Sequence, residues 1–451
     1  MGLYDFSEGV KEGEKREADC ACTDEKTAER ITRIMDQLAD RKTEALHLVR
    51  VPACDPEGAF FGIQAYTYDG MDADGRKTKV FAYIGFPDNL QQNEKVPGVV
   101  LVHGGGGHAF AQWVKAWNDR GYAAIAMDTT GSFPYAVKAG APAGASGEWI
   151  HGPYGIFEEE GYCAAPDFDD MNPLIPAEEM WMYHAVGQVL LANAVLGTFD
   201  AVDRSRIGLV GISWGSVISA LAIGYKNSFA FAVPIYGGGY LDESLSWMGE
   251  RFASKRIQTL WSAQDRFSRV KIPVLWLCMN DDTCFSLNVN SKSYIATAPN
   301  HAKTALSIKS GWVHGHDCCW DTANYPCYES FAFADSIVGK GPQYTAVADQ
   351  PEAAAPGSAV SCTFTCHENA SVRAKLYYLT ERYAYTKQPE NAAASLCSEW
   401  QSVSADVDRR SRTVMATVPP EATCYYLELT TEQDGISYIT ASRFINLREQ
   451  E

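Results

Sequence analysis

Five continuous apolar runs, each ending in Gly, Ser or Asp, constrain the fold of this chain more than any other feature. They lie at residues 96–107, 122–131, 206–216, 229–239 and 272–282, with helical stretches between them. Apolar runs of this kind are typical of strands that are buried on both faces. Strands that alternate with helices predict an α/β fold with a mostly parallel sheet, and functional loops then gather at the carboxyl ends of the strands.

The segments around these runs have other patterns. Residues 47–51, 61–68 and 79–86 are short, alternate in polarity and are separated by Gly, Asp and Pro, so they predict antiparallel strands and hairpins. Residues 129–177 are rich in Gly, Pro and aromatic residues and show no periodicity. A loop of this length is usually functional, and we predict that it forms a lid over the site.

The chain of 451 residues exceeds what one hydrophobic core usually organises, so two domains are expected. Its first 45 residues predict a charged leader that ends in a helix, with Ile31, Ile34 and Leu38 on one stripe that packs against the main domain. The predicted organisation is a helical leader at 1–45, an α/β domain at 46–342, a linker at 343–358 and an immunoglobulin-like β-sandwich at 359–451.

Charge and composition exclude several classes of partner. The 56 acidic side chains outnumber 38 basic ones, and the net charge of -18 disfavours nucleic acid and anionic membranes as partners. The apolar runs are too short to span a bilayer, and the first residues lack the apolar stretch of a secretory signal. The 13 cysteines lack the spacing of a disulfide framework, so we expect reduced thiols and a cytoplasmic protein. An oligomer is compatible with the sequence.

One serine is predicted to be a nucleophile. The sequence Gly211-Ile-Ser213-Trp-Gly215 directly follows an apolar run and precedes helical residues. A sharp turn from strand to helix holds such a serine exposed above the sheet, and the flanking glycines allow the close backbone approach that the turn requires. Because the bare pattern arises by chance in roughly one such chain in five, its position between strand and helix carries the prediction for Ser213.

A glycine loop precedes this serine by one strand-helix unit. The sequence His103-Gly-Gly-Gly-Gly107 ends an earlier apolar run. Such a loop can turn a backbone N–H toward a developing oxyanion, and we predict that Gly105 does so together with Trp214. A tight turn without a catalytic role explains the glycines alone equally well, but the placement before Ser213 favours the catalytic interpretation.

An acid and a base should follow the serine in chain order. Asp281 and Asp282 both end the last apolar run, and either could orient a histidine while the other caps a helix or lies in solvent. His314 and His316 lie in a loop at a suitable distance after this run, whereas His301 opens a charged segment. A serine hydroxyl becomes a good nucleophile only when an imidazole accepts its proton and a carboxylate fixes the imidazole tautomer.

The histidine loop also allows an interpretation as a metal site. His314, His316 and Asp317 could bind a metal with Cys318, Cys319 or Cys327, but no second ligand cluster with zinc-like spacing accompanies them. We therefore expect no metal and no cofactor. Aromatic candidates for a substrate pocket, each equally explained by core packing, are Trp149, Trp181, Trp214 and Trp312.

Residues 179–186, 202–216 and 231–241 closely resemble bacterial proteins grouped with the acetyl xylan esterases. These proteins belong to the wider dienelactone-hydrolase and prolyl-oligopeptidase-like hydrolases, which have the α/β-hydrolase fold. The resemblance runs from about residue 95 to 340, and the C-terminal segment is similar to a small domain that many of these proteins carry.

The resemblance also implies roles and a function. The family has an Asn-Asp pair, then two residues and an aromatic residue, and Asp281-Asp282-Thr-Cys-Phe285 matches this pattern if Asp282 is the acid. The family's His-Gly-His loop matches His314-Gly-His316, and because the catalytic histidine of related hydrolases is usually the one followed by glycine, the resemblance implies His314 as the base, with His316 second. Ser216 stands where the family usually has glycine and Gly238 where cysteine is common. Neither departure touches the three implied catalytic residues, but the resemblance does not define pocket shape or substrate. The implied activity is hydrolysis of a small ester, above all an O-acetyl group on a saccharide. Alternatives are an acylaminoacyl peptidase and a catalytically silent carbohydrate-binding protein.

Overall fold

The computed structural model describes most of the chain. The described residues are 10–39, 46–73, 77–88, 90–134, 149–150, 172–226, 229–317, 327–386, 394–395 and 399–450. Most of the segment predicted to be a lid lies outside them, apart from its ends and a short pairing of β6 (Phe133–Pro134) with β7 (Trp149–Ile150). No helix within the described ranges is both long enough and apolar enough to be a membrane span.

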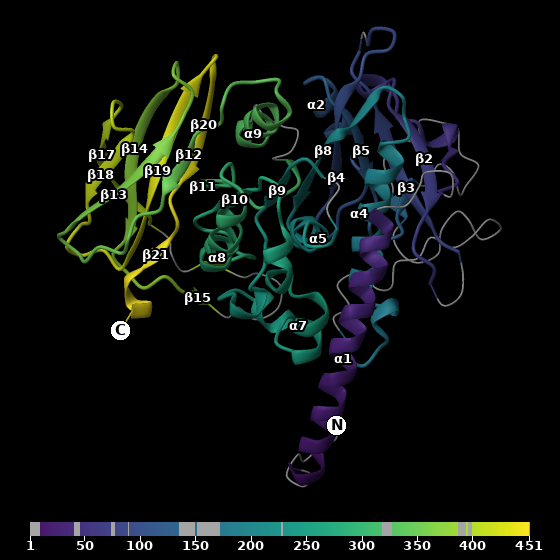
Figure 1. The fold of residues 1–451 in the computed structure, drawn as a ribbon, viewed down its shortest axis with the longest axis horizontal. Helices are drawn as coiled ribbons and strands as arrows, with labels where there is room; N and C mark the ends of the chain where they lie inside the picture. The colour runs from purple at the N-terminus through teal and green to yellow at the C-terminus, as the bar shows by residue number, and fades with distance from the viewer. Residues whose placement is uncertain are drawn as a thin grey trace.

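A nine-stranded mixed sheet forms the centre of the larger domain (Figure 1). Its order is β1-β2-β3-β5-β4-β8-β9-β10-β11. The strands are β1 (Val49–Arg50), β2 (Gln64–Asp69), β3 (Lys79–Gly85), β4 (Val96–Val102), β5 (Ala123–Met127), β8 (Val202–Ile212), β9 (Ala232–Ile235), β10 (Leu275–Met279) and β11 (Ala305–Lys309).

The strand directions confirm the predicted fold. The five apolar runs supply β4, β5, β8, β9 and β10, and these strands and β11 are parallel to one another. The three alternating segments supply β1, β2 and β3, which pair antiparallel, and β3 pairs antiparallel with β5. This is the α/β-hydrolase fold, in which the carboxyl ends of the parallel strands share one edge of the sheet.

The helices that connect the strands along the chain cover the sheet. They are α2 (Ala111–Asn118), α4 (Trp181–Leu196), α5 (Trp214–Ala222), α6 (Met248–Arg251), α7 (Lys255–Trp261), α8 (Leu287–Thr297) and α9 (Tyr328–Val338). Every residue of α4 is buried, as expected for a helix that is apolar on all sides.

The N-terminal helix is longer than predicted. Helix α1 spans Val10–Ala39, because the charged residues before the apolar stripe are themselves good helix formers. Ile31 and Leu38 of the predicted stripe are buried and Ile34 is half-buried. The helix runs beside α4 (Figure 1), and the ion pair of Arg30 with Glu178 joins it to the segment that leads into α4.

The C-terminal domain is entirely antiparallel in its main sheet, as predicted. The order is β12-β13-β18-β17-β14-β19-β20, with β21 paired to β19. The strands are β12 (Ala346–Asp349), β13 (Ala359–Thr365), β14 (Ser371–Leu379), β17 (Gln401–Asp408), β18 (Thr413–Thr417), β19 (Cys424–Gln433), β20 (Ile436–Ala441) and β21 (Ile445–Asn446); a further short pair is β15 (Tyr385–Thr386) with β16 (Ala394–Ser395). Strand β12 falls in the segment expected to be a linker and pairs with β13.

Strand β19 belongs to two hydrophobic cores at once. Its side chains alternate between faces, so Tyr425 packs in the core of the C-terminal domain while Tyr426 packs in the core of the α/β domain. Strand β20 lies next to β11, the edge strand of the central sheet (Figure 1). The two domains therefore share a continuous apolar interface.

Candidate active site

Ser213 lies in the sharp turn between β8 and α5, as the sequence predicts. Its backbone has φ 57° and ψ -121°, a conformation that few residues other than glycine adopt. A Cβ atom on Gly211 would lie 2.2 Å from the Gly215 carbonyl oxygen, and one on Gly215 would lie 2.2 Å from the carbonyl oxygen of Val102. Only glycine fits at these two positions, so the flanking glycines of the motif are required by the turn.

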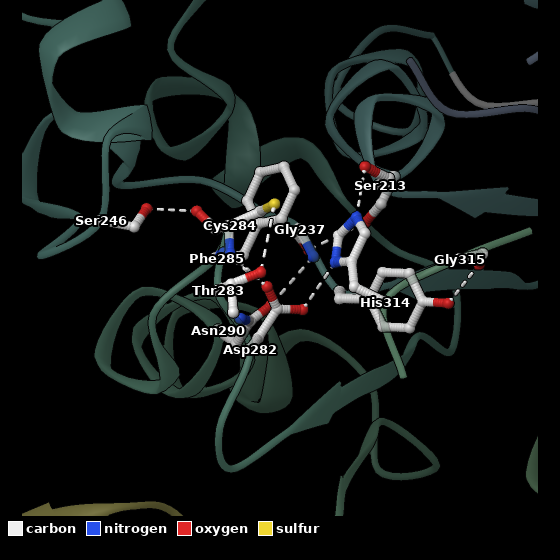
Figure 2. A network of polar contacts seen from close by, with 12 residues as sticks. Ser213, Gly237, Ser246, Asp282, Thr283, Cys284, Phe285, Asn290, His314 and Gly315 are labelled. Atoms are coloured by element: carbon white, nitrogen blue, oxygen red, sulfur yellow. Dashed lines mark hydrogen bonds and ion pairs between the residues drawn. The ribbon is translucent and has the colours of Figure 1, made fainter. Parts of the chain in front are cut away.

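Three side chains from distant loops meet at this turn (Figure 2). His314 Nε2 lies 2.9 Å from Ser213 Oγ, and His314 Nδ1 lies 3.0 Å from Asp282 Oδ2. A carboxylate only accepts hydrogen bonds, so Nδ1 carries the proton and donates it to Asp282. The lone pair of Nε2 then faces Ser213, whose hydroxyl donates to it.

Asp282 is held rigidly by its own loop. The side chain is 0% exposed and follows β10. Its Oδ1 accepts hydrogen bonds from the backbone N–H groups of Cys284 at 2.6 Å and Phe285 at 2.8 Å. These donors stabilise the ionised carboxylate and leave Oδ2 directed at His314.

His314 is positioned by two aromatic rings. The ring of Tyr236 lies 4.5 Å from the imidazole, and the ring of Phe285 stacks nearly parallel to it at 6.0 Å. The Tyr236 hydroxyl also donates to the carbonyl oxygen of Gly315 at 2.7 Å, which ties the histidine loop to the end of β9. No sequence pattern predicted the contact of Tyr236 with His314, and Phe285 was expected only as the aromatic residue of the family pattern. No spacing rule marks an aromatic ring that packs against a distant histidine.

The structure distinguishes the two adjacent aspartates. Asp281 Oδ1 is buried and has no hydrogen-bond partner among the described residues. Burial raises the pKa of the Asp281 carboxyl, and the neighbouring charge of Asp282 raises it further. Asp282, not Asp281, meets the histidine, in the register that the family resemblance implied.

The second histidine of the loop contacts the glycine loop instead. His316 Nε2 accepts a hydrogen bond from Gly104 N–H at 3.2 Å. Burial is the main cause that lowers the pKa of His316 to about 4, so the ring is neutral and can accept. A Cβ atom on Gly104 would lie 2.8 Å from Ser213 Cβ, which shows how closely the glycine loop approaches the nucleophile.

The predicted oxyanion donors flank this contact. Gly105 follows Gly104 in the chain, and Trp214 follows Ser213 as the first residue of α5. Both backbone N–H groups thus belong to segments that border the serine hydroxyl. Their catalytic role remains a prediction.

The tryptophans predicted to line a pocket lie in different surroundings. Trp181 is buried, stacks edge to face on Trp214 at 5.5 Å and donates to the carbonyl oxygen of Thr129 at 2.7 Å. Trp312 is buried 5.9 Å from the ring of Tyr236. The side chain of Trp149 lies outside the described part of the structure.

The two histidines that could serve as metal ligands contact different partners in the described part of the structure. His314 Nε2 faces Ser213 while His316 Nε2 faces Gly104, and Cys318 and Cys319 lie outside the described residues. Ligand atoms of Asp282, Cys284 and His314 do lie within 4.8 Å of one another. However, Asp282 and His314 are already hydrogen bonded, and burial raises the pKa of the Cys284 thiol to about 11, so the thiol is protonated.

The sequence matches no protein-family model and no curated protein. Among solved structures, an acetyl xylan esterase from a Paenibacillus species is 18% identical, with a TM-score of 0.46, over 67% of this chain and 94% of that chain. An acetyl xylan esterase from a Thermoanaerobacterium species is 14% identical, with a TM-score of 0.40, over 62% and 88%. The acylaminoacyl peptidase of Pyrococcus horikoshii is 17% identical, with a TM-score of 0.41, over 60% and 41%.

Proposed function

We propose that the protein is a serine hydrolase of carboxylic esters. The observation that carries the proposal is the unbroken series of hydrogen bonds from Asp282 through His314 to Ser213. A nucleophile, a base and a group that orients the base are the parts that acyl transfer requires, and their mutual distances are those of a working set.

The reaction follows from these positions. Ser213 Oγ attacks the carbonyl carbon of the ester while His314 Nε2 takes its proton, and the Asp282 carboxylate stabilises the imidazolium that forms. The N–H groups of Gly105 and Trp214 stabilise the oxyanion of the tetrahedral intermediate. His314 then protonates the departing alcohol, which leaves an acyl group on Ser213. Water, activated by the same imidazole, hydrolyses this acyl-enzyme and restores the serine.

We further propose that the substrate is a small neutral ester, above all an O-acetyl group on a sugar or oligosaccharide. The family resemblance of residues 179–186, 202–216 and 231–241 supports this class. The net charge of -18 opposes anionic substrates. Hydrolysis of amide substrates instead would make the protein a peptidase that uses the same three residues.

Labelling with a fluorophosphonate tests the mechanism directly. The wild-type protein should be modified at Ser213, and a Ser213→Ala variant should not. Ser216→Ala is the matched control: this buried serine lies three residues along the chain and donates to the Gly237 carbonyl oxygen at 2.9 Å, so its loss should leave labelling intact.

Substrate class is tested on the same variants. Wild-type protein should release acetate from acetylated xylo-oligosaccharides and p-nitrophenol from p-nitrophenyl acetate, but no p-nitroaniline from acyl-amino-acid anilides. Ser213→Ala should lower turnover by about 10⁶-fold. An unlabelled wild-type protein would overturn the proposal and favour a silent binding protein, whereas equal labelling of Ser213→Ala would overturn it by placing the reactive nucleophile elsewhere.

A further inference from the structure

We infer that the C-terminal domain is part of the catalytic apparatus, with Tyr426 as a positioning residue that holds the loop of Asp282 through Asn280. This inference rests on the proposed function, because it assigns a role in the same reaction. It gives the C-terminal domain a role that no sequence pattern indicated.

Asn280 connects the two domains at the end of β10. It is 1% exposed and lies two residues before Asp282. Its side-chain Nδ2 donates to the Tyr426 hydroxyl at 3.1 Å, and its carbonyl oxygen accepts from Trp400 Nε1 at 3.2 Å. Its N–H donates to the Lys309 carbonyl oxygen within the central sheet at 3.0 Å. Two of these three hydrogen bonds therefore come from the C-terminal domain.

The loop is held again on the far side of Asp282. The N–H of Leu287, the first residue of α8, donates to the Tyr383 hydroxyl at 2.6 Å. One turn further along α8, Ser291 Oγ accepts from the N–H of Phe444 at 2.9 Å. Residues 280–287, which include Asp282, are thus fixed at both ends by the C-terminal domain.

The groups that hold the loop form a packed aromatic cluster. Tyr426 stacks on Tyr377 at 5.3 Å and meets Trp400 edge to face at 5.3 Å, while Tyr383 packs on Phe444 at 5.0 Å. Burial raises the pKa of the Tyr426 hydroxyl, so this group stays neutral as a hydrogen-bond partner. Rings packed in this way have little freedom to shift, and the loop that they hold has little as well.

The anchoring matters because Asp282 moves with its loop. The donors to Asp282 Oδ1 are the N–H groups of Cys284 and Phe285, which belong to the same loop. They fix the carboxylate relative to the loop but not relative to His314, which lies on another loop. The contacts of Asn280 and Leu287 supply that second constraint, and misplacement of a catalytic group by about 1 Å can cost about 10²-fold in rate.

Two neighbouring tyrosines on β19 provide a matched test. Tyr426 and Tyr425 are both 0% exposed and differ in the face of the strand that they occupy. The Tyr425 hydroxyl accepts from the N–H of Ala354 at 2.8 Å, and Ala354 packs against the core of the C-terminal domain. Tyr426→Phe and Tyr425→Phe therefore each delete one buried hydroxyl from the same strand.

We expect Tyr426→Phe to lower kcat for p-nitrophenyl acetate about tenfold with KM within about twofold of wild type. Tyr425→Phe should retain wild-type kcat, while the two variants lose a similar amount of thermal stability. Asn280→Ala should lower kcat as Tyr426→Phe does, and the double variant should show little further loss, since both changes break one interaction.

The outcomes separate this inference from the proposed function. If wild-type protein is labelled at Ser213 but the two tyrosine variants have equal kcat, the C-terminal domain is not a positioning element. If the effects of Tyr426→Phe and Asn280→Ala on kcat are fully additive in the double variant, the inference that Tyr426 acts through Asn280 is also overturned. If wild-type protein is not labelled at all, the proposed function itself fails. Circular dichroism identifies any variant that does not fold. If Tyr426→Phe or Asn280→Ala fails to fold, the kcat of the other one is compared with that of Tyr425→Phe.

Discussion

Replacement of Asp282 by asparagine should nearly abolish turnover while leaving the fold intact. The amide has the size of the carboxylate, but its two ends differ. The backbone N–H groups of Cys284 and Phe285, at 2.6 and 2.8 Å from Oδ1, require an acceptor there. The amide oxygen must take this place, so the NH₂ group faces His314.

The wrong tautomer of His314 is the consequence. An NH₂ group facing Nδ1 is satisfied only if Nδ1 accepts, which puts the imidazole proton on Nε2. Nε2 lies 2.9 Å from Ser213 Oγ and would then be unable to take the hydroxyl proton. In the serine protease triad the equivalent change costs about 10⁴-fold in kcat, which corresponds to about 5 kcal/mol of activation free energy. We expect a loss of this order here.

The assay compares kcat/KM for p-nitrophenyl acetate and the rate of fluorophosphonate labelling between variants. Asp281→Asn is the control, because it makes the same chemical change one residue away. Asp281 Oδ1 has no hydrogen-bond partner among the described residues, so this variant should keep wild-type turnover. The reasoning is refuted if Asp282→Asn retains more than about a tenth of wild-type activity, or if Asp281→Asn is the inactive one.

Two further predictions concern stability and the glycine loop. Burial raises the pKa of Glu428 from its usual 4.5 to about 7, so the folded state gains stability from its protonated form below pH 4.5 and loses it as pH rises through about 7. Glu428→Gln should therefore be more stable than wild type at pH 8 by up to about 3 kcal/mol, since one pKa unit corresponds to about 1.4 kcal/mol. At pH 4.5 the two proteins should have similar stability. Urea unfolding measures both differences, and equal stability at pH 8 would contradict the prediction. Gly104→Ala would bring a Cβ atom within 2.8 Å of Ser213 Cβ and 3.1 Å of His316 Nε2, so kcat should fall about 10²-fold with a smaller change in KM. Wild-type turnover in this variant would show that the loop yields to the extra methyl group.

The sequence predicted the fold better than the contacts within it. Long apolar runs identify strands such as β4 and β8 because a strand buried on both faces tolerates few polar residues. The position of Ser213 between such a strand and a helix could also be predicted from the sequence, since a sharp turn needs glycines at fixed places. The full length of α1 could not be predicted, because its charged first half has no apolar stripe.

Interactions between remote segments were beyond sequence reasoning. Residues alone left Asp281 and Asp282 equivalent, and a family resemblance was needed to choose between them. The contact of the Tyr236 ring with His314 and the hydrogen bond of Asn280 to Tyr426 depend on how loops and domains pack together. Such contacts carry no periodicity or motif, because they join residues separated by 78 and 146 positions.

At Ser213, selection for stability and selection for turnover favour different residues. A non-glycine residue held at φ 57° and ψ -121° costs about 1–3 kcal/mol, which glycine would largely recover. A library of variants sorted only by heat resistance or expression would therefore enrich glycine at a position whose side chain the proposed mechanism requires. Directed evolution of this protein needs a selection for turnover in every round.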